Sequence, residues 1–542
     1  MPISSLPSPH GIGTMGKAAY DFADFLAAAG QKYWQLLPLG PTSYGDSPYQ
    51  SFSSFAGNPY FIDLDLLIKD KLLTRAEVNS CDWGDDPRYV DYGKIYESRF
   101  ALLEKAKARG FARDHEDIAA FEKKNERWLP DYALFMALKR HFGMKAWTEW
   151  DDEDIRCRKD SAVIERYRGM LRDDVELFTY IQFLFFRQWT ALKDYIHSLG
   201  IRIIGDLPIY VAMDSADVWA EPEMFQLDEH NVPVEVSGVP PDCFSADGQL
   251  WGNPLYNYEA MARDGYGWWI RRVGGAQQLY DVIRIDHFRG FESYWAIPYG
   301  ETTAKNGRWV KGPGMSLVGV LTGWFRDLDF IAEDLGYPSP EVVQLLNDSC
   351  LPGMKVLEFA FDSRDPSNYL PHSCNFNSIC YTGTHDNETV EAWYEELEDR
   401  EKSYVLAYLD KEKPGKNGIS RDLIRLAMMS SADTCIIPLQ DWLGLGRGAR
   451  MNYPSTIGTN WKWRTDATVF TKKLQKEIRS LTEFAFRAEP QPEDESVSTE
   501  ETEAADESVS TKETEAADEP VSTKENETTT TKEMEAKISC NL

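Results

Sequence analysis

Three carboxylates stand at the ends of apolar runs in this sequence. Asp286 follows "DVIRI", Glu333 follows "DFIA" and Asp386 follows "SICYTGTH". Continuous apolar runs are typical of strands that are buried on both faces of a parallel sheet. The spacing leaves room for about one strand–helix unit between the first pair of acids and about two units between the second pair. If the strands form one barrel, the three acids project into one bowl at their carboxyl ends.

Carboxylates that converge in this way can break a glycosidic bond. One acid attacks the anomeric carbon of the sugar while a second acid protonates the leaving oxygen. Arg284 lies two residues before Asp286, so the two side chains share a direction on a strand, and the cation favours the charged carboxylate that a nucleophile needs. The sequence neighbours of Glu333 are apolar. An apolar setting raises a carboxyl pKa, as a general acid requires.

Each acid also has a purely structural interpretation. A single carboxylate at a strand end is more often a helix N-cap or an ion-pair partner, and only the triple at barrel spacing, with Arg284 and His385 beside it, favours catalysis. His287 and His385 could be core histidines or, with aspartate neighbours, could imitate metal ligands. The sequence contains no HExxH motif or equivalent cluster. We therefore expect no metal.

Alternating helices and strands must position these acids. The apolar spacing at 173–199 predicts a helix that stops at Gly200 and leads into a strand. The predicted strands are 32–41, a faint one at Tyr60–Asp63, 201–211, 281–288, 329–336, 354–361, 378–386 and 434–444. Eight strands alternating with helices predict an α/β fold, a (β/α)8 TIM barrel, with the acids after strands four, five and seven.

Two stretches interrupt this alternation. Residues of about 66–175 are charged and largely helical. They are too long for one crossover and predict an inserted helical subdomain. Residues 239–257 are rich in Pro and Gly yet carry apolar side chains such as Phe244 and Trp251. They predict an active-site loop that packs as a plug or a lid, with Trp251 among the substrate-binding residues.

The C-terminal part of the chain differs in composition. Residues 488–542 repeat segments such as "ESVSTKETEAAD" with a period of about 12 and hold about 17 acidic and 4 basic residues. Such a segment cannot bury a core, so it predicts a disordered acidic tail behind a catalytic barrel at 1–487. The tail could act only as a solvating segment or could dock on a partner, which the sequence does not identify.

The overall composition excludes several kinds of partner. The chain of 542 residues has a formal net charge of -30, which argues against nucleic acid and anionic membranes, because both require basic patches. Eight scattered cysteines without a CxxC pair predict a reducing cytoplasm. Neither a signal peptide nor an apolar run of about 18 residues is found, so we expect a soluble protein. The 17 Trp, 26 Tyr and 26 Phe suit sugar binding, although buried aromatics are commoner.

Several motifs together resemble those of one known family. These motifs, in chain order, are "LPSPHGIGTMG", "YWQLLPLGPTSYGDSPYQSFSSFAGNPY", "IGDLPIYV", "PPDCFSADGQLWGNPLYN", "VIRIDHFRGF", "IAEDLG", "YTGTHDNET" and "MNYPSTIGTNWKWR". Over residues of about 4–485 the chain resembles the 4-α-glucanotransferases, also called amylomaltases or disproportionating enzymes, of the α-amylase clan. The acidic repeats lie outside the resemblance.

The resemblance implies a retaining double displacement on α-1,4-glucans without a cofactor or metal. A glucan segment would move to a new 4-hydroxyl on glucose or another glucan. Asp286 would be the nucleophile, Glu333 the general acid/base and Asp386 the acid that holds the distorted sugar. The resemblance also implies sugar-binding roles for five further residues. The residues for the same glucose are Arg284, His385 and Asp206, and those for neighbouring subsites are Tyr49 and Asn460, with Trp251 supplied by the predicted loop.

Two other functions stay open at this point. A hydrolase of the same clan would use the same covalent intermediate, and water at about 55 M would win unless a sugar acceptor is bound and the site is shielded. The loop at 239–257 is the predicted shield. A non-catalytic glucan-binding protein on a barrel is the second alternative, although the three acids are all present.

Overall fold

Seven parallel strands form the central sheet of the computed structural model, which describes residues 1–241, 245–336, 339–364 and 369–488. The strands follow one another in chain order, each paired in parallel with the next. They are β1 (Tyr33–Gln35), β2 (Arg202–Leu207), β5 (Val282–Ile285), β8 (Asp329–Ala332), β9 (Gly353–Val356), β10 (Ser378–Tyr381) and β11 (Thr434–Ile436). Long crossovers between parallel neighbours are the connections of an α/β fold.

The seven strands curl into a nearly closed barrel. One apolar cluster takes a side chain from every strand, and only the inside of a curled sheet can collect all of them. Its members are Tyr33, Ile204, Val282, Ile331, Leu335, Met354, Val356, Ile379, Tyr381 and Ile436. Across the interior, the Tyr381 hydroxyl of β10 donates a hydrogen bond of 3.0 Å to the Gln35 side chain of β1. This confirms the predicted α/β barrel.

The expected strand at Tyr60–Asp63 is wrong. The chain there forms a single 3₁₀ turn, η3 (Pro59–Phe61), because Pro59 lacks a backbone N–H and the Asn58 side chain caps the turn by accepting from Tyr60 N at 2.9 Å. Asp63 then caps the next helix. The acids consequently follow the third, fourth and sixth of the described parallel strands.

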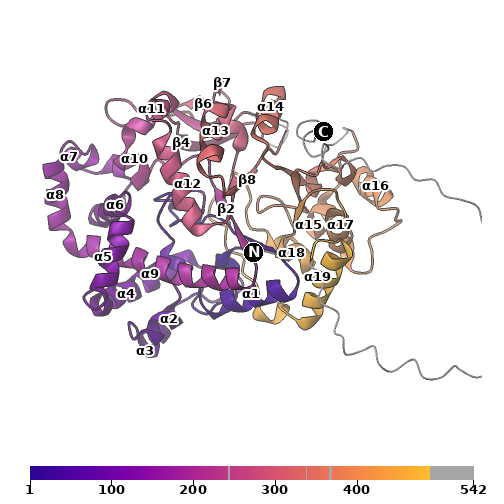
Figure 1. The fold of residues 1–542 in the computed structure, drawn as a ribbon, viewed down its shortest axis with the longest axis horizontal. Coiled ribbons are helices and arrows are strands. Elements are labelled where there is room, and N and C mark those ends of the chain that lie inside the picture. The colour runs from indigo at the N-terminus through magenta and orange to yellow at the C-terminus, as the bar shows by residue number, and fades with distance from the viewer. Residues whose placement is uncertain (242–244, 337–338, 365–368, 489–542) are drawn as a thin grey trace, which may run out of the picture. The chain divides into compact units, whose positions relative to one another are not determined.

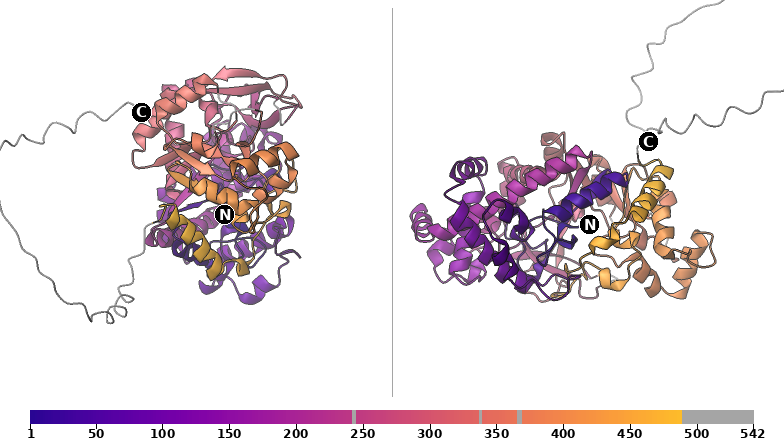
Figure 2. Two further views of the ribbon diagram at one scale, coloured as in Figure 1. Left: turned by 90° about the vertical axis from the view of Figure 1, so that its right-hand side faces the viewer. Right: turned by 90° about the horizontal axis from the view of Figure 1, so that it is seen from below.

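Helices surround the barrel on both sides (Figures 1 and 2). Those of residues 64–198 gather on one side in the views, and those of residues 390–484 gather on the other. The first group contains α2 (Leu64–Lys69), α3 (Arg75–Asn79), α4 (Tyr92–Gly110), α5 (His115–Lys124), α6 (Leu129–His141), α7 (Glu153–Arg156), α8 (Ser161–Met170) and α9 (Arg172–Ser198). The long helix α9 packs on α1, α4, α5 and α6, and Gly200 follows it with a positive φ of 74° before β2.

The remaining helices precede the first strand, lie between strands or follow the last strand. They are α1 (Lys17–Ala28), α10 (Ala216–Ala220), α11 (Tyr258–Arg263), α12 (Gly267–Leu279), α13 (Met315–Trp324), α14 (Pro340–Ser349), α15 (Val390–Glu396), α16 (Asp399–Tyr408), α17 (Gly418–Met428), α18 (Leu439–Trp442) and α19 (Lys472–Phe484). Single 3₁₀ turns are η1 (Ile3–Ser5), η2 (Tyr44–Asp46), η4 (Trp147–Glu149), η5 (Pro222–Met224), η6 (Phe288–Phe291), η7 (Leu357–Phe359), η8 (Pro371–Ser373), η9 (Arg447–Ala449) and η10 (Ala467–Val469). Among the described residues no helix is long and apolar enough to cross a membrane.

A second sheet of four antiparallel strands replaces part of the predicted loop at 239–257. Its order is β4 (Gln249–Pro254), β3 (Glu235–Val239), β6 (Ser293–Pro298) and β7 (Arg308–Lys311). Gly248 lets the chain turn back into β4, because its φ is 67° and an added Cβ would lie 2.5 Å from the Val239 carbonyl oxygen. The Pro- and Gly-rich composition thus hid a strand. Phe244 lies outside the described residues.

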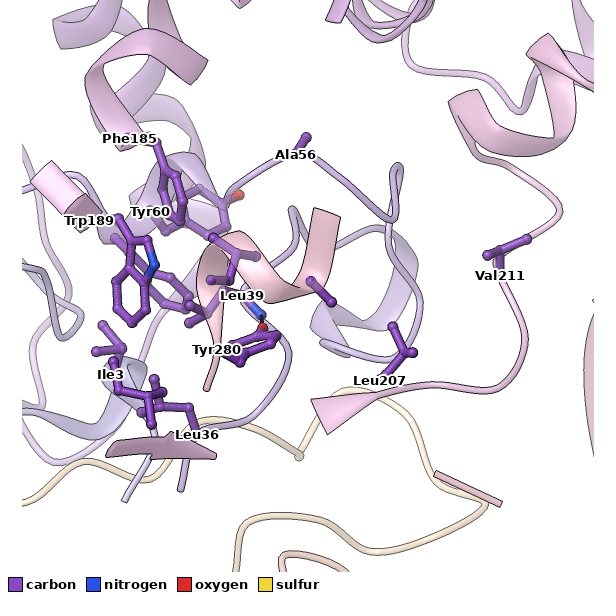
Figure 3. Close-up of a cluster of buried hydrophobic side chains, with 14 of the residues drawn as sticks. Ile3, Leu36, Leu39, Ala56, Tyr60, Phe185, Trp189, Leu207, Val211 and Tyr280 are labelled. Atoms are coloured by element: carbon purple, nitrogen blue, oxygen red, sulfur yellow. Dashed lines mark hydrogen bonds between the residues drawn. The ribbon is translucent and has the colours of Figure 1, made fainter. Parts of the chain in front are cut away.

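A large apolar core joins the outer helices to the barrel. Figure 3 shows part of it, where Phe185 and Trp189 of α9 lie with Tyr60 and Leu39. Tyr280, at the end of α12, accepts a hydrogen bond of 3.0 Å from Leu39 N through its hydroxyl oxygen. The core thereby fixes the segment after β1, which leads to the candidate site.

Candidate active site

A buried guanidinium stands at the centre of the candidate site. Arg284 lies on β5 beside Asp206 of β2, and its Nη1 donates to both oxygens of Asp206 at 2.7 Å. The same nitrogen donates to Asp286 Oδ1 at 3.1 Å. The side chains of Arg284 and Asp286 therefore do share a direction, as their spacing predicts. One cation serves two carboxylates.

Because Arg284 also pairs with Asp206, its positive charge compensates the charge of Asp286 only in part. Burial raises the pKa of Asp286 to about 7, and Arg284 opposes this while the charges of Asp206 and Glu333 add to it. Burial alone would lower the pKa of Arg284, but the two aspartates outweigh it and hold that pKa well above its usual value. Arg284 thus favours the ionised form of Asp286, as its spacing predicts, but this effect does not outweigh burial. Arg284 makes two hydrogen bonds to Asp206 and one to Asp286.

Backbone N–H groups hold Glu333 beside Asp286. Glu333 follows β8, and its two carboxylate oxygens accept from His287 N at 2.7 Å and Leu335 N at 2.9 Å. His287 adopts the left-handed conformation with φ 51°, directly after Asp286. Burial raises the pKa of Glu333, although Arg284 and the two N–H groups lower it. Burial within the fold, more than apolar neighbours in the sequence, is thus the cause of the raised pKa.

The third acid is oriented from two sides. Asp386 Oδ1 accepts from the Asn452 side-chain amide at 2.6 Å, and Asp386 Oδ2 lies 3.3 Å from His385 Nε2. Burial would raise the pKa of Asp386, but His385 and Asn452 outweigh it and hold that pKa well below its usual range. Burial would likewise lower the pKa of His385, and the Asp386 carboxylate reverses this, so the pKa of His385 is raised. The Asp386 carboxylate thus favours the protonated form of His385.

Tyr49 links the two halves of the site. Its hydroxyl donates to Asp206 Oδ2 at 2.6 Å, and its ring stacks on His385 with centroids 5.1 Å apart and an angle of 21° between planes. Burial, with Asp206 second, holds the pKa of Tyr49 well above its usual value, so the phenol stays a donor. A continuous path of contacts therefore runs from Asp286 through Arg284, Asp206 and Tyr49 to His385 and Asp386.

Trp251 lies against the turn that follows Asp286. Its ring is 4.8 Å from the ring of His287, at an angle of 86°, and its indole N–H donates to the Gln249 side chain at 3.1 Å. Burial, with Arg289 second, lowers the pKa of His287 to about 3, so this histidine is neutral near pH 7. His287 is thus a packing partner whose backbone N–H, rather than its ring, serves Glu333.

The hydrogen bonds of the predicted site residue Asn460 stay within its own loop. Its side-chain oxygen accepts from Tyr453 N at 3.0 Å, and its amide nitrogen donates to the Thr456 carbonyl oxygen at 3.0 Å. These bonds hold the loop 453–460 in shape. The next residue, Trp461, does reach the site, with its ring 5.7 Å from Tyr49 and 5.8 Å from His385.

Sequence reasoning missed Arg450 and Asn452. Asn452 N donates to the His385 carbonyl oxygen at 3.1 Å, and Arg450 Nη2 donates to the Asp386 carbonyl oxygen at 2.7 Å. Arg450 also faces the buried Glu388 at 3.4 Å. Asn452 lies in the motif "MNYPSTIGTNWKWR" and Arg450 directly precedes it, and this motif was the only hint of them in the sequence. The spacing within this motif does not show which side chains reach a loop 64 residues earlier.

Three carboxylates, one guanidinium and several neutral hydrogen-bonding groups make up the site. Within the described ranges no group of three or more His, Cys, Asp or Glu side chains is arranged to hold a metal ion. The arrangement offers one carboxylate for attack, a second for proton transfer and a third for hydrogen bonding to sugar hydroxyls. A nearly closed barrel that carries three acids at its carboxyl end is the arrangement expected of an enzyme that acts on glycosidic bonds.

Comparison with known proteins narrows this class. A family model described as 4-alpha-glucanotransferase, of glycoside hydrolase family 77, matches residues 1–469. A 4-alpha-glucanotransferase of Clostridium butyricum is 47% identical over 493 residues, which cover 90% of this chain and 100% of that protein. One from Thermus thermophilus is 47% identical over 89% of this chain and 97% of that protein. The solved amylomaltase of Streptococcus agalactiae in complex with acarbose has a TM-score of 0.88 and 40% identity, and covers 90% of this chain and 99% of that one.

The chain belongs to the 4-alpha-glucanotransferase family. This confirms the family that the motifs indicate and, with it, the transfer of α-1,4-glucan segments by a transglycosylase that retains the anomeric configuration. Membership of this family argues against the two alternatives, a hydrolase and a non-catalytic binding protein.

Removal of the Asn452 amide tests how Asp386 is oriented. We expect Asn452→Ala to lower kcat about 10- to 100-fold with a smaller change in KM, because the Asp386 carboxylate loses a hydrogen bond that orients it. Steady-state kinetics on maltotriose measure this split. The matched control is Asn306→Ala, which removes an exposed amide that donates to Glu301 at 3.1 Å and should leave kcat unchanged. Equal kcat values for the two variants would contradict the role of Asn452.

Proposed function

We propose that Asp286 is the nucleophile, Glu333 the general acid/base and Asp386 the residue that holds the distorted sugar. The observation that carries this proposal is the pair formed by Asp286 and Glu333. Arg284 holds Oδ1 of Asp286, whose side chain is 28% exposed toward the bowl, and backbone N–H groups fix both oxygens of Glu333. Since burial raises both pKa values, the pair favours a state with one proton.

The first step forms a covalent glycosyl-enzyme. An Asp286 oxygen attacks the anomeric carbon as the bond from that carbon to the 4-oxygen of the leaving glucan breaks, and Glu333 gives its proton to that oxygen. Asp386 accepts hydrogen bonds from sugar hydroxyls, for which its low pKa keeps it ionised. Arg284, His385 and Asp386 bind the same glucose.

The second step returns the enzyme to its first state. A 4-hydroxyl of an acceptor glucan attacks the anomeric carbon and gives its proton to Glu333, and the bond to Asp286 breaks. Two inversions retain the configuration. Water at about 55 M competes for the intermediate, so the acceptor must be bound and water displaced. Trp251, packed on His287 beside Asp286, supports the proposal that the 239–257 segment contributes to this shielding.

The proposed substrates are maltooligosaccharides and maltodextrin, and by extension glycogen or starch. The proposed compartment is a reducing cytoplasm, which the six free cysteines of the described part support. We also propose that residues 1–487 form the complete catalytic unit, because the Clostridium butyricum relative is covered over its full length by 493 residues.

The assignment of the nucleophile is tested with maltotriose. The unaltered enzyme should produce glucose together with a ladder of longer glucans, and Asp286→Asn should lower the rate at least about 10⁴-fold because no covalent intermediate forms. Thin-layer or anion-exchange chromatography of the products measures both. A matched control, Asp327→Asn at the opposite end of the barrel, should retain the ladder. Retained activity in Asp286→Asn would overturn the proposal.

The pH dependence of kcat/KM tests the shared proton. We expect a bell-shaped profile, because Asp286 must be ionised and Glu333 protonated, so activity falls as pH falls and again as pH rises. The charge of Asp206 raises the pKa of Asp286, so Asp206→Asn should lower that pKa and move the acidic limb to lower pH. The pH at which the acidic limb falls is the quantity to compare. If Asp206→Asn only removed a contact to the sugar, kcat/KM would be lower at every pH and the limb would stay at the same pH. An acidic limb that stays in place or moves to higher pH would contradict this account.

The boundary of the catalytic unit is tested by truncation after Arg487. The truncated enzyme should keep the kcat and the melting temperature of the full chain within experimental error. A loss of activity with the melting temperature unchanged would show that the catalytic unit extends further.

A further inference from the structure

An exposed tryptophan lies close to the turn that follows Asp286. Trp309, on the edge strand β7, is 43% exposed. It is paired across the strands with Trp295 of β6, and the two rings lie 5.2 Å apart at 69°. Arg289, three residues after Asp286 in η6, places its guanidinium carbon 4.2 Å from the centre of the Trp309 ring. An indole and a cation thus form one surface.

The guanidinium of Arg289 retains unused donors. Its Nε is buried without a hydrogen-bond partner among the described residues. The nearby carboxylate of Glu292 instead pairs with Lys311 of β7. Burial lowers the pKa of Arg289, and Glu292 opposes this, so the side chain remains a cation near neutral pH. The Arg289 side chain as a whole is only partly buried, so the rest of its guanidinium can donate to an oxygen atom of a ligand.

This surface lies beside the segment that carries Glu333. Phe288 N, in the turn with Arg289, donates to the Glu333 carbonyl oxygen at 3.1 Å. On the other side, Glu341 near the start of α14 has a lowered pKa, for which the Ser339 hydroxyl is the larger cause and the charge of Lys311 a smaller one.

We infer that Trp309 and Arg289 form a binding platform for the glucan chain on the acceptor side of the site. The inference rests on the proposed role of Glu333, because the group that exchanges its proton with the 4-oxygen faces the leaving and incoming chain. The apolar face of a glucose ring stacks on an indole, and its hydroxyl oxygens accept from the guanidinium. The pair Trp309–Trp295 holds the indole in a fixed position, so little ordering is needed on binding.

With this platform, the reactivity of an acceptor depends on its length. A glucose acceptor occupies only the position next to the anomeric carbon, whereas a longer acceptor extends along the chain direction and gains the contact with Trp309. Longer acceptors then compete better with water and with glucose for the covalent intermediate.

The test compares two acceptors with maltotriose as donor. Labelled glucose and labelled maltoheptaose are offered in turn, and the ratio of kcat/KM for maltoheptaose to that for glucose is measured. Trp309→Ala should lower this ratio about tenfold, as the loss of one aromatic stack predicts. The matched control is Trp324→Ala, an exposed tryptophan at the end of α13, before β8 and so at the opposite end of the barrel. It should leave the ratio unchanged.

A ratio that does not change in Trp309→Ala, or that falls equally in Trp324→Ala, would overturn the inference. An equal loss with both acceptors would assign Trp309 a structural role and also overturn it. Trp309→Leu, which keeps an apolar strand residue, decides the question if the alanine variant does not fold, as judged by its melting temperature. These outcomes leave the roles of the acids untouched, since those roles fail only if Asp286→Asn stays active.

Discussion

The site depends on one buried cation that two carboxylates share. Arg284 is almost completely buried, and water cannot compensate its charge, so Asp206 and Asp286 must do so. Removal of one partner from a buried ion pair typically costs about 3–5 kcal/mol, because the other charge is left uncompensated. The same sharing sets the chemistry. With Asp206 taking most of the contacts, Asp286 is held in place while its charge stays weakly compensated, which keeps it available for attack.

The barrel makes this arrangement possible through its register. Asp206 and Arg284 are neighbours on β2 and β5, and the alternation of side chains points both into the interior with Ile204 and Val282. At the carboxyl end of the barrel, short turns follow the strands. The left-handed turn at His287 aims one N–H at Glu333, while Asn452 reaches from a distant loop to Asp386. Rigid strands hold one half of the site and loop contacts hold the other.

Sequence reasoning found what local pattern determines and missed what distant contacts determine. Apolar runs located the seven parallel strands and the acids after them, and the two-residue spacing of Arg284 and Asp286 predicted their contact. Local composition misled at Tyr60–Asp63, where proline and a cap form a turn, and at 239–257, where glycine and proline conceal β4. The link from Tyr49 to Asp206, the clamp by Asn452 and the stacking of Arg289 on Trp309 each join distant parts of the chain, and no periodicity encodes them.

In the proposed mechanism, Asp286 carries the sugar between donor and acceptor. The most direct measurement uses Glu333→Gln with an α-maltosyl fluoride, whose leaving group needs no proton, so that the first step proceeds and the second is slow. Peptide mass spectrometry after rapid acid quenching should find one maltosyl group on the peptide that contains Asp286, and Asp286→Asn in the same background should carry none. A sugar on Asp386 or Asp206, or no covalent adduct while fluoride is still released, would contradict the account.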